Sequence, residues 1–215
     1  MRRGVVIYNG FDTEKLKYSL ATREKSRKRL GLNSNQIVIG HVARFHSMKD
    51  HQLFLSSARE IIKKKPGTVF VAAGRNVVPE NPAFPAWIRS TGLQSNFLLL
   101  GESDSVYDLY QAMDFLTVSS AWGEGFPNVL GEAMSFSVPC ITTDVGESAA
   151  VVAETGRVIQ PRDKASMIDA MMSCVNMSTE ERLQLGEQAR DRIVSKFSVE
   201  LMTQGYDDLY HSLIA

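Results

Sequence analysis

The sequence has few cysteines and no long hydrophobic run. Its only two cysteines are Cys140 and Cys174, too few for a disulfide framework. Both lie in apolar patterns, which predicts reduced thiols in the core of a cytoplasmic protein. No apolar run reaches the ~18 residues that would span a bilayer. The first residues also have no apolar segment typical of a secretory signal.

An excess of charge of one sign is lacking too. Lys+Arg and Asp+Glu both number 24, so the formal net charge is zero. Because nucleic-acid binding favours a basic surface, this balance argues against a nucleic-acid partner. No G-x-G-x-x-G fingerprint follows the first predicted strand, which disfavours a dinucleotide-dependent dehydrogenase. No metal-binding cluster is visible, so we expect neither a metal nor a cofactor.

Hydrophobic residues make up 44% of the 215 residues, enough for a proper core. Short apolar runs alternate with helical patterns along the whole chain. This alternation predicts an α/β fold, a doubly wound parallel sheet of Rossmann-like type. The predicted strands cover residues 5–8, 36–42, 68–73, 96–101, 114–118, 138–142 and 156–159. The predicted helices cover residues 22–31, 50–65, 81–92, 105–113, 164–175, 179–196 and 198–213, and one more opens at Pro127.

The most informative stretch runs from Ala121 to Met134 (AWGEGFPNVLGEAM). It reads as a glycine-rich loop after a buried strand, followed by a helix. Backbone N–H groups at such a helix terminus favour an anion. Glu124 on the loop and Glu132 in the helix are poor phosphate ligands but good acceptors for sugar hydroxyls. The local chemistry therefore predicts a phosphate held by backbone amides, with hydroxyl-bearing rings on either side.

A second loop, after the strand at residues 36–42, carries Arg44 and Lys49. In open parallel sheets the carboxyl ends of the strands bind ligands. Two cations five residues apart on such a loop can converge on one pyrophosphate, Arg by a forked contact and Lys as a point charge.

With Gly125, Phe126, Asn128 and Ala133, the two glutamates resemble the two-glutamate motif of retaining GT-B glycosyltransferases of family four, glycosyl transferases group 1. Many members make bacterial polysaccharides. The segment Asn9-Gly10-Phe11-Asp12 is similar to the signature that follows the family's first interdomain crossing. The resemblance covers nearly the whole chain but only the carboxy-terminal, donor-binding half of the family's enzyme.

The resemblance implies a nucleotide-diphosphate sugar as substrate. Arg44 and Lys49 would hold the diphosphate, assisted by amides in the Gly125–Phe126–Pro127–Asn128 stretch. Glu132 would accept hydrogen bonds from the ribose, and Glu124 from the donor sugar. The backbone around Gly101 and Glu102 would receive the nucleobase. The reaction would be glycosyl transfer with retention, and Glu124, Arg44 and Lys49 would act in it directly.

The resemblance also implies partners. Residues 1–215 would form one nucleotide-sugar-binding domain, with the amino-terminal acceptor domain absent or supplied separately. The acceptor would be a glycan or lipid-linked molecule, so a cytoplasmic protein could sit peripherally at the inner face of the membrane. Two alternatives stay open: a nucleotide-sugar-binding subunit without activity, and a sugar-nucleotide epimerase. Product analysis with and without an acceptor distinguishes a transferase from an epimerase.

Two further expectations concern the surface of the protein. The basic residues of the first helix, Arg23 and Arg27 among them, read as a solvated face because acidic residues balance them elsewhere. The last helix could contact a partner domain or its own domain, through Tyr206, Leu209, Tyr210 and Leu213.

Overall fold

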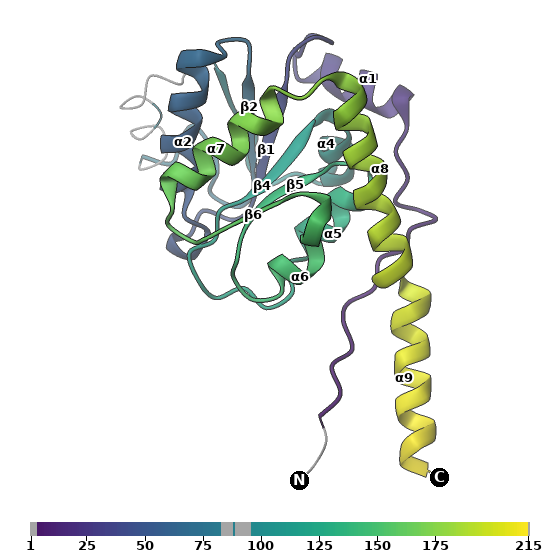
Figure 1. The fold of residues 1–215 in the computed structure, drawn as a ribbon. Helices are drawn as coiled ribbons and strands as arrows, with labels where there is room; N and C mark the ends of the chain where they lie inside the picture. Colours follow the sequence, from purple (N-terminus) through teal and green to yellow (C-terminus); the bar gives the residue numbers. More distant parts are fainter. Residues whose placement is uncertain (1–3, 83–87, 89–95, 215) are drawn as a thin grey trace.

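The computed structural model describes residues 4–82, 88 and 96–214. Its centre is a six-stranded sheet in the order β3-β2-β1-β4-β5-β6, in which every paired strand is parallel. The strands are β1 (Val38–Val42), β2 (Val69–Ala73), β3 (Phe97–Leu99), β4 (Phe115–Val118), β5 (Cys140–Thr143) and β6 (Arg157–Ile159). The doubly wound parallel sheet predicted from the alternating pattern is confirmed (Figure 1).

Helices join the strands and cover both faces of the sheet (Figure 1). They are α1 (Leu20–Arg29), α2 (His51–Lys64), α4 (Val106–Ala112), α5 (Asn128–Ser135), α6 (Ser148–Val152), α7 (Lys164–Val175), α8 (Thr179–Lys196) and α9 (Val199–Ile214), with 3-10 turns η1 (Ser47–Lys49) and η3 (Ala153–Thr155). The bounds of α7 and α8 agree with the prediction. At the start of α8, Ser178 and Glu181 form a reciprocal capping box, which fixes where the helix begins.

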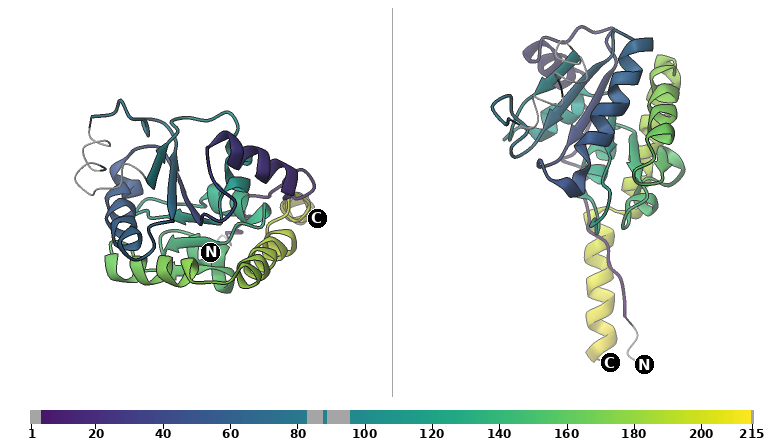
Figure 2. Two further views of the ribbon diagram at one scale, coloured as in Figure 1. Left: turned by 90° about the horizontal axis from the view of Figure 1, so that it is seen from above. Right: turned by 90° about the vertical axis from the view of Figure 1, so that its left-hand side faces the viewer.

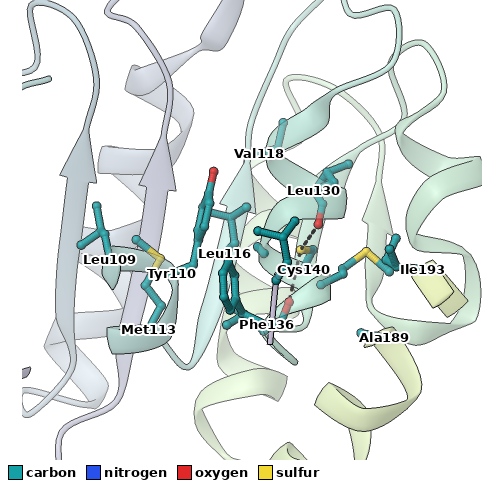
Figure 3. Close-up of a cluster of buried hydrophobic side chains, with 14 of the residues drawn as sticks. Leu109, Tyr110, Met113, Leu116, Val118, Leu130, Phe136, Cys140, Ala189 and Ile193 are labelled. Atoms are coloured by element: carbon teal, nitrogen blue, oxygen red, sulfur yellow. Dashed lines mark hydrogen bonds between the residues drawn. The ribbon is translucent and has the colours of Figure 1, made fainter. Parts of the chain in front are cut away.

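Alternating side chains of each strand belong to two hydrophobic clusters, one on each face of the sheet. In β4, Leu116 packs with residues of α4, α5 and α8, whereas the neighbouring Phe115 packs with residues of α2 and α7. Figure 3 shows the first cluster, where Tyr110 stands beside Leu116 and the Cys140 thiol donates to the Leu130 carbonyl. A parallel sheet buried on both faces explains why its strands read as continuous apolar runs.

Three segments differ from the sequence prediction. Residues 5–8 form no strand, and Val5 and Val6 are exposed; this apolar run lies along the last helix instead of joining the sheet, and it lines a groove with Leu201 and Gly205. The short helix α6 was not predicted. The helix predicted at residues 81–92 falls largely outside the described residues.

The solvated basic face predicted for α1 is wrong for two of its arginines. Arg27 is buried, and Arg23 and Arg27 both contact the carboxylate of Asp114, at 2.8 Å and 3.4 Å. The buried carboxylate also accepts the Val38 N–H at 2.8 Å. Asp114 therefore ties α1 to the starts of β1 and β4, which a helical pattern alone does not reveal.

The last helix, α9, extends away from the body of the domain and runs beside the amino-terminal segment (Figures 1 and 2). None of its residues is buried. Tyr210 and Leu213 are 61% and 72% exposed. Exposed apolar side chains gathered on one element are typical of a surface that meets a partner.

Candidate functional site

The candidate site lies where β1 and β4 are neighbours in the sheet. The strand order changes direction between these two strands: β2 and β3 follow outward from β1, and β5 and β6 follow outward from β4. The loops after β1 and β4 therefore begin at adjacent strand ends. Here the two loops are tied together by the Ala121 N–H, which donates to the Met48 carbonyl at 2.8 Å. The Ser119 hydroxyl donates to the Lys49 carbonyl at 2.8 Å. The prediction that both loops lie at one edge of the sheet is thus confirmed.

A buried histidine side chain supports the contact between these two loops. The Nε2 atom of His41 lies 2.9 Å from the Ser119 hydroxyl. Because that hydroxyl gives its single proton to main-chain carbonyls, the ring nitrogen must donate. Burial lowers the pKa of His41 well below its usual value, and it lowers the pKa of the adjacent His51 to about 4. Both rings are therefore neutral near pH 7. The sequence reading missed this support; its only signal was a histidine inside an apolar strand.

Lys49 and Glu124 meet above the junction. The Lys49 ammonium pairs with a carboxylate oxygen of Glu124, which also accepts from the Ser120 hydroxyl. The Glu124 side chain is only 8% exposed and that of Lys49 18% exposed. The pair is therefore partly desolvated, where charge–charge attraction is stronger than in water. Ser120 is a second site residue that the sequence reading did not single out.

Arg44 stands on the same loop but is exposed, and the described residues offer it neither an ion pair nor a hydrogen bond. It lines a cavity of about 290 Å³ together with Arg75, Glu102 and Ser103. Arg75 and Glu102 form a long ion pair of 3.7 Å on its rim. Gly101, the residue before Glu102, has a φ of +67°, a conformation that suits glycine. Arg44, one of the residues predicted to hold the diphosphate, therefore shares a cavity with Glu102, one of the two predicted at the nucleobase.

Helix α5, which follows the Glu124 loop, begins one residue later than predicted. Pro127 occupies the N-cap position of α5, and no side chain caps the helix. The first amides of α5 are therefore left without a side-chain partner. Behind the loop, Gly146 lies so close that a Cβ there would sit 2.3 Å from the Glu124 carbonyl oxygen. The next residue, Glu147, donates its N–H to the Gly125 carbonyl at 2.9 Å, so this segment holds the backbone of the Glu124 loop.

Glu132 lies further along α5 and has a different environment. Its Oε2 atom accepts a hydrogen bond of 2.8 Å from Tyr110, a fully buried residue of α4. Burial, and then the neighbouring Glu132 charge, raise the pKa of Tyr110, so the phenol remains a donor. Glu132 and Asn128 line a groove of about 440 Å³. The amide of Asn9 donates to the Asn128 side chain at 2.9 Å.

The structure thus divides the predicted residues into three neighbouring groups. Lys49 and Glu124 are in contact, Arg44 shares a cavity with Glu102, and Glu132 shares a groove with Asn128. Across residues 4–82, 88 and 96–214, no group of three or more His, Cys, Asp or Glu side chains could hold a metal ion. Within the same residues, no helix has the length and apolar character needed to cross a bilayer.

Known proteins resemble this chain in sequence and in fold. The lipopolysaccharide core biosynthesis mannosyltransferase LpsB of Rhizobium meliloti (strain 1021) is 28% identical over 220 residues, covering 97% of this chain and 61% of that protein. The Escherichia coli UDP-Gal:alpha-D-GlcNAc-diphosphoundecaprenol alpha-1,3-galactosyltransferase is 28% identical over 214 residues, 97% of this chain and 54% of that protein. The chain therefore spans little more than half the length of these curated relatives.

Two solved structures show the likeness in fold. Anabaena HepE in complex with UDP superposes with a TM-score of 0.88 at 23% identity, covering 97% of this chain and 57% of that one. The C-terminal domain of the group 1 glycosyl transferase LpcC from Francisella tularensis superposes with a TM-score of 0.75 at 20% identity, covering 88% of this chain and 100% of that one. The family model for glycosyl transferases group 1 matches residues 22–192. This chain belongs to the glycosyl transferases group 1 family.

Proposed function

We propose that this chain is the donor-binding half of a retaining GT-B glycosyltransferase that moves a sugar from a nucleotide-diphosphate sugar to a glycan or lipid-linked acceptor. The observation that carries the proposal is the meeting of the two loops at the β1–β4 junction. That meeting places two cations, an uncapped helix N-terminus and a desolvated carboxylate at one strand edge. Such an edge is where open α/β sheets bind nucleotides.

The relatives support a nucleotide-sugar donor. The E. coli relative is named for UDP-Gal, and HepE is described in complex with UDP and with UDP-glucose. The match to an isolated C-terminal domain supports the assignment to that half. The exposed apolar side chains of α9 supply a surface that an amino-terminal half could cover. A cytoplasmic enzyme at the inner face of the membrane would fit a lipid-linked acceptor.

In this assignment Arg44 and Lys49 hold the diphosphate, and the Gly125–Asn128 amides assist. The nucleobase lies against the Gly101–Glu102 backbone beside Arg44. Glu132 accepts from the ribose; Tyr110 occupies only one of its oxygens and fixes the direction in which the carboxylate points. Glu124 faces the donor sugar, and the Lys49 contact orients it.

Retaining transfer develops positive charge on the sugar ring and negative charge on the departing diphosphate. Lys49 lies between the two charges: it pairs with Glu124 on one side and is available to the phosphate on the other. Interactions that strengthen as charge develops raise turnover as well as binding. Arg44 and Lys49 can supply this stabilisation without a metal ion.

Removing either cation should weaken nucleotide binding. Arg44→Ala and Lys49→Ala should each reduce the affinity for UDP by roughly 1.5–3 kcal/mol, the range for hydrogen bonds to charged groups. Isothermal calorimetry on the purified chain measures this. Arg59→Ala is the matched control, since Arg59 is an exposed arginine of α2, and it should bind UDP normally. Unchanged affinity in both folded site variants would contradict the phosphate role.

Replacing each of the two glutamates should weaken the binding of different ligands. Glu132→Ala should weaken UDP and UDP-sugar alike, because both contain ribose. Glu124→Ala should weaken the UDP-sugar and leave UDP nearly unaffected. Paired titrations of each variant with the two ligands test this. An equal loss of UDP affinity in Glu124→Ala would show that the two roles are reversed or wrong.

A further inference from the structure

A second cavity, of about 790 Å³, opens at the amino ends of the strands. The segments that lead into β1, β4 and β5 line it, together with the first turn of α8. Strands of a parallel sheet have one direction, so this cavity lies at the edge opposite the β1–β4 loops. Its volume is within the range of small-molecule sites.

A cluster with more positive than negative charge lies at the cavity wall: Arg23, Arg182 and Asp114 line the cavity, and Arg27 contacts Asp114 without lining it. Three guanidiniums contact the single carboxylate of Asp114: Arg23 at 2.8 Å, Arg27 at 3.4 Å and Arg182 at 3.4 Å. Their side chains are 19%, 6% and 15% exposed. Partly buried like charges are costly unless a counter-ion accompanies them. Burial lowers the pKa of Arg27; the Asp114 carboxylate opposes this shift, and the positive charges of Arg23 and Arg182 add to it.

The three arginines differ in how many donors they have left. Arg23 gives two N–H groups and Arg27 gives three to main-chain carbonyls, which are uncharged and do not neutralise them. Arg182 has only the 3.4 Å contact with Asp114 and one of 3.3 Å to the Thr179 hydroxyl. In the part of the chain that the structure describes, its Nη1 group has no partner. Arg182 is therefore the guanidinium best able to take a ligand.

Arg23 and Arg182 could act on one anion. Both line the cavity, and both approach the same oxygen of Asp114, Oδ1. Two guanidiniums that share one carboxylate oxygen are close enough to share a phosphate as well. The other carboxylate on the wall, Glu187, is exposed to solvent, where its charge is screened.

The remaining wall is apolar and hydroxylated. Tyr18, Phe136 and Leu183 give it an apolar surface, and Ser178 and Thr179 add hydroxyl groups. We propose that this cavity binds a small phosphate monoester with an aromatic or apolar body, its phosphate between Arg23 and Arg182. The body of the ligand lies on the apolar wall. The site is separate from the donor site and can be filled at the same time.

Phenyl phosphate is the probe, because it joins a phosphate monoester to an aromatic ring. Calorimetric titration of the whole chain should show binding that persists at saturating UDP, and inorganic phosphate should bind more weakly. Arg182→Gln should weaken phenyl phosphate at least tenfold while leaving the UDP affinity unchanged. Arg59→Gln, the matched exposed arginine of α2, should change neither.

Displacement of phenyl phosphate by UDP would overturn the proposal, since the probe would then occupy the donor site. Equal affinity in wild type and a folded Arg182→Gln would overturn it as well. If that variant fails to fold, amide chemical shifts of the wild-type chain decide: the proposal requires shifts at Thr179 and Leu183 on adding phenyl phosphate. A chain that binds phenyl phosphate but not UDP would contradict the proposed function and leave this site standing.

Discussion

The 215-residue chain alone should bind UDP yet transfer no sugar. The chain spans 61% and 54% of the two transferases compared above, and in the proposed GT-B arrangement the acceptor is held by the other half. Without that half the acceptor is not held against the donor carbon. Positioning of this kind accounts for ~7–11 kcal/mol of catalysis, and open solvent would also reach the donor site.

A radiolabelled UDP-sugar assay tests this, with lipid-linked and oligosaccharide acceptors. The control is the same chain mixed with, or fused to, the amino-terminal half of a group 1 relative, where transfer should appear. UDP binding by the chain alone, measured in parallel, shows that the donor site is intact. Robust transfer by the chain alone would contradict the prediction and would mean that this chain, or a second copy of it, builds the acceptor wall.

Replacing the buried carboxylate at the opposite edge should cost the fold about 3–5 kcal/mol, the range for removing one partner of a buried ion pair. Asp114→Ala leaves Arg23, Arg27 and Arg182 without their shared counter-ion. It also leaves the buried Val38 N–H without its acceptor. Because α1, β1 and β4 meet at this one side chain, the loss falls on the centre of the sheet.

Urea denaturation followed by circular dichroism measures the free energy of unfolding of each variant. Asp108→Ala is the control, since Asp108 faces Arg29 in an exposed pair at 3.9 Å. Exposed pairs contribute about 1 kcal/mol or less. A loss below about 1 kcal/mol in Asp114→Ala would show that the arginines find other partners and that the carboxylate is not the anchor of the cluster.

Much of the architecture could be predicted because its signals are local. Strand and helix periods, together with the capping box at Ser178, located α7 and α8 to the residue. The rule that ligands bind at the carboxyl ends of parallel strands predicted the edge where the Lys49 and Glu124 loops lie, but it did not predict that these two side chains pair. The phosphate, ribose and sugar roles of the site residues stay predictions.

What could not be predicted depends on contacts between distant residues. The helical pattern of α1 predicts a solvated Arg27, yet its side chain is buried, because it pairs with Asp114, 87 residues away in the sequence. The apolar run at residues 5–8 has strand composition but lies along α9 instead of joining the sheet. Tyr110 looks like an ordinary core residue of α4, and only the packing of α4 on α5 brings its hydroxyl to Glu132.

The strand order has a consequence for how the protein folds. β1 pairs with β4, although β2, β3 and α4 lie between them in the sequence. The pairs β1–β2–β3 and β4–β5–β6 each follow chain order, so each wing of the sheet closes shorter loops than the seam between the wings. Lys49 belongs to one wing and Glu124 to the other. In a refolding chain with both wings formed but the seam open, the proposed nucleotide site is therefore incomplete, and we expect UDP binding during refolding to report closure of the seam.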